Sequence, residues 1–196
     1  VSVDNQTPWQ RVARDFAESP LALIGLAIFL CIVGLAVFAP FIAPQNPYDL
    51  NQLDIMDGTL PPGSKAGAGF TYFLGSDPQG RDMLSAIFYG LRISLGIGAG
   101  SAVIACILGA SLGLVAAYVG GRFEQILMRI VDIQLGFPAI LVALVLLAVL
   151  GKGVDKIIVA LVAVQWAYYA RTARAAALVE RNKEYVEAAR ALGLSG

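Results

Sequence analysis

The sequence predicts an all-α protein, a polytopic bundle of transmembrane helices, and three observations support this fold class. Hydrophobic residues make up 58% of the 196 residues and charged residues only 14%, whereas soluble domains carry roughly 25% charged residues. The mean hydropathy is +0.72. Long uncharged runs recur along the chain, and a helix of about 20 apolar residues crosses the hydrocarbon core of a bilayer. The chain therefore belongs in a membrane, in contact with lipid.

Charge and residue usage argue against several classes of function. The 14 basic and 14 acidic residues cancel, so no electrostatic feature favours nucleic-acid binding. Histidine is absent, which removes the commonest zinc ligand and the commonest general base. Cys31 and Cys106 both lie inside apolar runs, where a thiol behaves as a small hydrophobic group. We expect no catalytic residues, no cofactor and no metal site in this chain.

The first apolar run, residues 21–43, follows a polar segment, residues 1–20. Its 23 uncharged residues are enough for about 30 Å of hydrocarbon. Pro20 suits the first turn of a helix, and Pro40 and Pro44 mark the far end. The run is too long for the apolar part of a signal peptide and has no small-residue cleavage site. We expect a transmembrane helix that is retained as an anchor.

Residues 44–92 are expected to form an extramembrane loop on the periplasmic side. Clusters of turn-forming residues, such as Asn46-Pro47 and Pro61-Pro62-Gly63, indicate irregular structure. Apolar residues recur at helical spacing from Asp77 to Arg92, which predicts an interfacial helix leading into the bilayer.

Three further spans are expected within residues 93–170. The uncharged runs 93–119, 133–150 and 157–170 contain 27, 18 and 14 residues. The shortest is marginal for a lone span and would need to pack against neighbouring helices. Pro138 is expected to open the straight part of the helix in the second of these runs.

Small residues at four-residue spacing occur twice in the run 93–119. Gly96 pairs with Gly100, and Gly109 pairs with Gly113. Such pairs allow another helix to approach closely. The approaching helix could belong to this chain or to a partner membrane protein, and the spacing alone leaves both interpretations open.

Gln165 is a polar residue inside the run 157–170. A polar side chain in hydrocarbon faces the helix bundle or a cavity. Gln165 could therefore line a substrate path, or it could make an interhelical hydrogen bond, and both hypotheses stand at this stage.

The distribution of Lys and Arg favours a cytoplasmic N-terminus. With four spans, the cytoplasmic segments would hold nine of the fourteen basic residues: Arg11, Arg14, Arg122, Arg129, Arg171, Arg174, Arg181, Lys183 and Arg190. An excess of positive charge on the cytoplasmic side is typical of membrane proteins. The same orientation places residues 171–196 in the cytoplasm.

The cytoplasmic segment, residues 171–196, has the pattern of a charged amphipathic helix that ends at Gly193. Pairs such as Glu180 with Lys183 and Glu187 with Arg190 would stabilise an ordinary solvated surface helix. The same segment could also be a docking surface for a soluble partner.

The segment from Glu187 to Gly193, EAARALG, resembles the EAA loop (E-A-A-x-x-x-G) of permease subunits in binding-protein-dependent ABC importers. Four further segments extend the likeness over nearly the whole chain: residues 73–85 (FLGSDPQGRDMLS), 89–95 (YGLRISL), 120–122 (GGR) and 137–139 (FPA). Together they resemble the dipeptide/oligopeptide permease C family.

This resemblance implies a type I importer permease with a MetI-like fold. The stretch from Glu184 to Gly193 would be a coupling helix that inserts into a separate cytoplasmic ATPase subunit. Its contact residues would be Glu184, Tyr185, Glu187, Ala188 and Ala189, with Gly193 permitting the chain to reverse. The other implied partners are a second permease subunit and an extracytoplasmic solute-binding protein. In the family the EAA loop continues into further spans, so we expect the translocation domain to be incomplete within these 196 residues.

ATP hydrolysis is expected on another subunit. The one glycine-lysine pair, Gly151-Lys152, is followed by Gly153 where a phosphate-binding loop requires Ser or Thr. Two alternatives to the importer remain. An ion-driven secondary transporter would need ionisable groups at mid-membrane, and the first three uncharged runs have none. A non-transporting membrane assembly protein would need no ATPase.

Overall fold

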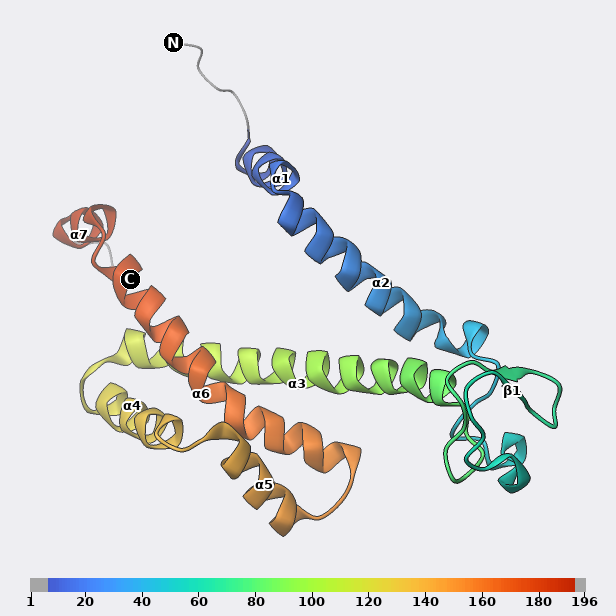
Figure 1. Cartoon of the computed structure of the whole chain (residues 1–196). Coiled ribbons are helices and arrows are strands. Elements are labelled where there is room, and N and C mark those ends of the chain that lie inside the picture. The colour runs from blue at the N-terminus through green and yellow to red at the C-terminus, as the bar shows by residue number, and fades with distance from the viewer. Residues whose placement is uncertain (1–6, 193–196) are drawn as a thin grey trace. The chain divides into compact units, whose positions relative to one another are not determined.

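The computed structural model describes residues 7–192, which divide between two compact units, residues 1–95 and 96–196. The first unit contains α1 (Pro8–Glu18), α2 (Pro20–Ile42), the loop that the sequence predicts to be extramembrane, and the beginning of α3 (Met83–Val119). The second contains the rest of α3, α4 (Gly121–Leu135), α5 (Ala139–Leu150), α6 (Val154–Arg181) and α7 (Glu184–Ala191) (Figure 1). The fold is all-α apart from one short hairpin in the loop.

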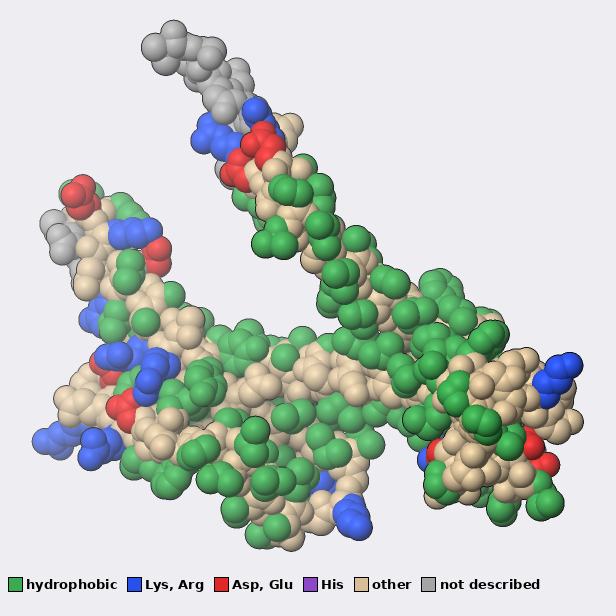
Figure 2. Space-filling view, viewed as in Figure 1, with side chains coloured by type: hydrophobic (Ala, Val, Ile, Leu, Met, Phe, Trp, Pro, Cys, Tyr) green, Lys and Arg blue, Asp and Glu red, His purple; other side chains and the backbone are tan. Residues whose placement is uncertain are grey.

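The helix α2 coincides with the first predicted span. Ser19 caps it by accepting a hydrogen bond from the backbone N–H of Ala22, and Pro20 occupies the first turn as expected. Hydrophobic side chains cover α2 along its length (Figure 2). Its 23 residues are long and apolar enough to cross a membrane. The helix ends at Ile42, one residue before the predicted end of the run at residue 43. Pro40, which was expected to mark the end, lies inside the helix.

The extramembrane loop is more ordered than its composition suggests. It contains two 3-10 turns, η1 (Leu50–Gln52) and η2 (Ile55–Asp57), and the strands β1 (Ser64–Lys65) and β2 (Thr71–Tyr72). The strands pair antiparallel, with Ser64 opposite Tyr72. Polar side chains hold these pieces together, as described below.

The helix α3 differs from the expected interfacial helix followed by a separate span. It begins at Met83 and continues for 37 residues to Val119. Asp82 caps its beginning, because the carboxylate accepts hydrogen bonds from the backbone N–H and the hydroxyl of Ser85. Residues 83–119 contain no proline, so the helix propagates from the loop into the apolar run.

The third predicted run is divided between two helices. The helix α4 ends at Leu135, α5 begins at Ala139, and the pair is bent by 91°. Pro138 precedes the first residue of α5, and a proline disfavours helical conformation at the residue before it. Among the described residues α2 and α3 are long and apolar enough to span a membrane, and the pair α4 and α5 adds a third candidate if it is one broken span. The helix α6 does not meet the same criterion.

The segment 171–196 was predicted to form one helix that ends at Gly193, but its described residues form the end of one helix and a second, separate helix. The helix α6 extends through the charged residues to Arg181. The chain then turns at Asn182 and Lys183, and a second helix, α7, follows. The turn separates the end of α6 from the residues that carry the EAA pattern.

The second unit has a small core where α4 meets α6. Val131 of α4 and Ala167 and Ala170 of α6 are fully buried. Met128, Leu135 and Trp166 pack around them. The helix α6 also packs along α5. Small side chains on α6 thus let α4 approach closely, and α6 is the central element of this unit.

Candidate functional site

The turn between α6 and α7 is held by Glu180. Its carboxylate accepts a hydrogen bond from the Lys183 ammonium group at 2.6 Å and one from the Tyr185 hydroxyl at 3.2 Å. The hydrogen bond with Lys183 lowers the pKa of Glu180 and raises the pKa of Lys183. All three side chains are exposed, so the contacts orient α7 more than they stabilise the fold.

The helix α7 contains most of the residues predicted to couple to an ATPase. Glu184 begins it, Tyr185 is 63% exposed, and Ala188 is also exposed. The side chains of Glu187 and Ala189 lie outside the described part of the structure, and so does Gly193. The described residues of α7 therefore present accessible side chains one turn away from the end of α6.

Three arginines connect α6 to the neighbouring helices of the second unit. Arg171 pairs with Asp132 of α4, and Arg174 pairs with Glu124 of α4 through Nε at 2.6 Å. The Arg174 pair is the less exposed, with side-chain exposures of 32% and 19%. Figure 2 shows acidic and basic side chains gathered where α4 meets the C-terminal half of α6.

The third arginine, Arg181, makes a different contact. Its Nη1 donates a hydrogen bond of 2.9 Å to the backbone carbonyl oxygen of Ala117, in the last turn of α3. Ala117 is only 3% exposed. The last four carbonyls of a helix have no partner within the helix, so this arginine satisfies a buried acceptor.

Gln134 was not singled out from the sequence, and it is an uncharged polar residue that also joins α4 to α6. Its amide nitrogen donates to the carbonyl oxygens of Ala163 and Val164, and its side-chain oxygen accepts the indole N–H of Trp166 at 3.0 Å. Gln134 lies inside the uncharged run 133–150, so the reasoning that singled out Gln165, a polar residue inside an apolar run, would also have singled out Gln134. In hydrocarbon such a network contributes to helix association.

Gln165 occupies a different environment. Its side chain is half-buried, and no hydrogen bond from it is found within residues 7–192. In the described residues interhelical hydrogen bonds are made by Gln134 and not by Gln165. That Gln165 lines a substrate path stays a proposal.

The two glycine pairs of α3 also differ. A Cβ added to Gly109 would overlap the carbonyl oxygen of Trp166, and one added to Gly113 would overlap that of Ala170. Both glycines therefore lie against the backbone of α6. A Cβ on Gly96 or Gly100 would meet no atom within 4 Å in the described part of the chain. Within residues 7–192, only the pair Gly109 and Gly113 makes a close approach to another helix.

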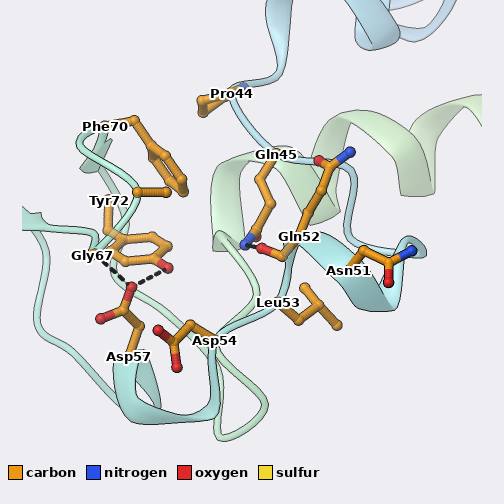
Figure 3. Close-up of a pocket in the computed structure, with 11 residues that line it drawn as sticks. Pro44, Gln45, Asn51, Gln52, Leu53, Asp54, Asp57, Gly67, Phe70 and Tyr72 are labelled. Carbon is orange, nitrogen blue, oxygen red and sulfur yellow. Dashed lines mark hydrogen bonds between the residues drawn. The ribbon is translucent and has the colours of Figure 1, made fainter.

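Residues of the loop between α2 and α3 line an open pocket of about 630 Å³ (Figure 3). Gln45, which is 3% exposed, donates to the carbonyl oxygens of Gln52 and Gly80 at 2.8 and 3.2 Å. The Tyr72 hydroxyl lies within hydrogen-bond distance of a carboxylate oxygen of Asp57, at 3.2 Å. Burial and this contact raise the pKa of Tyr72 to about 12. The network fixes the loop between the end of α2 and the start of α3.

These features describe an all-α, polytopic helical membrane protein. The family model for the inner membrane component of binding-protein-dependent transport systems matches residues 109–196. The model for the N-terminal transmembrane domain of oligopeptide transport permease C matches residues 7–62. The chain is thus similar to transport permeases of the dipeptide/oligopeptide permease C type over both of these segments.

Individual relatives are similar over nearly the whole chain. It is 36% identical over 188 residues to the dipeptide transport system permease protein DppC of Haemophilus influenzae, covering 96% of this chain and 63% of the relative. It is 40% identical over 188 residues to DppC of Escherichia coli K12, with coverages of 95% and 61%. It is 33% identical over 193 residues to the oligopeptide transport system permease protein OppC of Bacillus subtilis, with coverages of 98% and 60%. The chain thus spans about three fifths of the length of these relatives.

Proposed function

We propose that this chain forms part of the membrane permease subunit of an ABC importer for peptides or similar small solutes. The observation that carries the proposal is the arrangement at the end of α6, where a two-residue turn leads into the short helix α7. Glu184, Tyr185 and Ala188 of this helix are exposed, and its sequence has the EAA pattern. The names of the relatives support peptides as the solute class. The chain itself hydrolyses no ATP in this proposal.

The proposed assembly has three kinds of partner. A second permease subunit completes the translocation pathway, and cytoplasmic ATPase subunits bind α7. An extracytoplasmic binding protein delivers the solute. The complex lies in a bacterial or archaeal plasma membrane, and the excess of basic residues in the cytoplasmic segments supports a cytoplasmic N-terminus.

In the proposed mechanism α7 is the coupling helix. Glu187, Glu184 and Tyr185 contact a cleft of the ATPase, and Gly193 permits the chain to reverse after the helix. Closure of the ATPase pair on ATP displaces α7, and the displacement reaches the spans through α6. The less exposed Arg174–Glu124 pair and the Gln134 network join α4 to α6, so that the two helices can carry this displacement together.

Co-purification tests the proposal. The protein containing this chain is expressed with its sister permease and the ATPase subunits from the same source, with Glu187→Ala as the variant. Asp155→Ala is the matched control, because Asp155 is an exposed acidic residue in the first turn of α6, at the opposite end from α7. We expect wild type and control to retain the ATPase and Glu187→Ala to lose most of it. A wild-type protein that retains no ATPase, or equal losses in both variants, would contradict the proposal.

A further inference from the structure

The last residue of α6 is fixed to the last turn of α3. Arg181 donates from Nη1 to the carbonyl oxygen of Ala117 at 2.9 Å, although the two residues are far apart in the sequence. The carbonyl of Ala116 already accepts from the backbone N–H of Gly120, which ends the helix. The positive guanidinium also lies where the negative end of the α3 dipole is concentrated. The contact therefore has two effects. It gives the buried carbonyl oxygen of Ala117 a hydrogen-bond donor, and it places a positive charge beside the partial negative charge at the C-terminal end of α3.

Arg181 shares one face of α6 with the other two bridging arginines. Arg174 lies about one turn after Arg171, and Arg181 lies about two turns after Arg174. The first two bind carboxylates of α4, and Arg181 binds the end of α3. The helix α6 is therefore held along its C-terminal half, up to the residue before the turn.

The chain beyond Arg181 has room to move. An open hollow of about 650 Å³ lies among the ends of α3 and α6 and the start of α7, lined by Leu114, Ala117, Tyr118, Ala177, Glu180, Arg181, Tyr185 and Val186. The contacts that orient α7 across the turn, those of Lys183 and Tyr185 with Glu180, are made by exposed side chains. Exposed ion pairs contribute little stability, so they permit α7 to change its angle.

We propose that Arg181 is a positioning residue that sets the pivot of α7. The hydrogen bond to Ala117 joins the end of α6 to the end of α3, so that when α7 turns about Asn182 and Lys183 the resulting displacement of the end of α6 is passed to α3 as well. Without the hydrogen bond from Arg181 to Ala117, the end of α6 bends together with α7, and the displacement of α7 is lost before it reaches α3. This inference rests on the proposed function, because it concerns how force from an ATPase enters the permease.

The test uses the complete transporter in liposomes, comparing wild type with Arg181→Met, which keeps an apolar stem and removes every donor. Arg181→Lys restores one charged donor, and Arg122→Met is the control at an exposed arginine in the first turn of α4. The measurements are ATPase retention, thermal stability of the complex, and ATP hydrolysed per solute transported. We expect Arg181→Met to retain the ATPase and to raise ATP consumption per solute by about fivefold or more, with partial rescue by Lys and no effect of the control.

Two results would overturn the inference alone. One is an Arg181→Met transporter that couples as efficiently as wild type. The other is a loss of coupling that matches a parallel loss of assembled complex and thermal stability, since that indicates a structural role only. A wild-type complex that binds no ATPase would instead reject the proposed function, and the inference with it.

Discussion

Trp166 donates its indole N–H to the side-chain oxygen of Gln134 at 3.0 Å, and the amide of the same glutamine bonds to the backbone of α6. One side chain of α4 thus satisfies three polar groups at the contact between the two helices. The contact lies beside the buried residues Val131 and Ala167, so the polar network and the apolar core stabilise the same helix pair.

The variant Gln134→Leu should weaken the packing of α4 on α6. It removes three hydrogen bonds and leaves the Trp166 N–H without its partner, and we expect a loss of about 1 kcal/mol in the free energy of unfolding. Gln165→Leu is the matched control, since no hydrogen bond from Gln165 is found in the described residues. Unfolding in mild detergent measures both variants, and an equal or larger effect of Gln165→Leu would contradict the assignment.

Alanine at Gly109 or Gly113 should destabilise the contact between α3 and α6. Each added methyl group overlaps a backbone carbonyl oxygen of α6, which forces the helices apart at a cost of about 1–3 kcal/mol. Gly96→Ala and Gly100→Ala provide the controls, because their methyl groups meet open space in the described part of the chain. Thermal stability in detergent should fall for the first pair only.

Bulkier residues at Gly96 and Gly100 test the other interpretation of the glycine spacing. If this pair contacts the sister permease, leucine at either position should reduce co-purification of that subunit while leaving the stability of the isolated chain unchanged. Unchanged capture of the sister subunit would assign these two glycines to lipid contact.

Tyr72 should make the extramembrane loop sensitive to alkaline pH. Burial raises its pKa from 10.0 to about 12, so the folded loop holds the phenolic proton more tightly than the unfolded chain does. The stability that this provides is complete below pH 10 and is lost as the pH rises through about 12. The tyrosinate absorbance of wild type minus Tyr72→Phe should titrate near 12, and a midpoint near 10 would show that the hydroxyl is accessible.

The sequence predicted the features that depend on local composition. The first span was found to within a residue at each end, because an uncharged run between Pro20 and Pro44 has few alternatives in a membrane. The break near Pro138 followed from proline chemistry, although the 91° bend did not. The continuity of α3 was missed because Arg92 suggested a boundary, whereas a single arginine does not interrupt a helix.

Contacts between distant residues could not be predicted. The bond from Arg181 to Ala117 depends on where α3 ends relative to α6, which no local pattern encodes. The same holds for Gly109 and Gly113, whose spacing suggested a close approach without naming the helix that approaches. The turn at Asn182 and Lys183 was missed because charged and apolar residues continue across it at helical spacing.

Site-specific photo-crosslinking tests the central claim most directly. A photoreactive amino acid replaces Tyr185 of α7, which is 63% exposed, or Phe73 of the extramembrane loop, which is 67% exposed, in cells that express the complete transporter. The account predicts an ATPase adduct from position 185 and none from position 73, since the proposed orientation puts the two positions on opposite sides of the membrane. An ATPase adduct from position 73, or none from position 185 in an actively transporting cell, would contradict it.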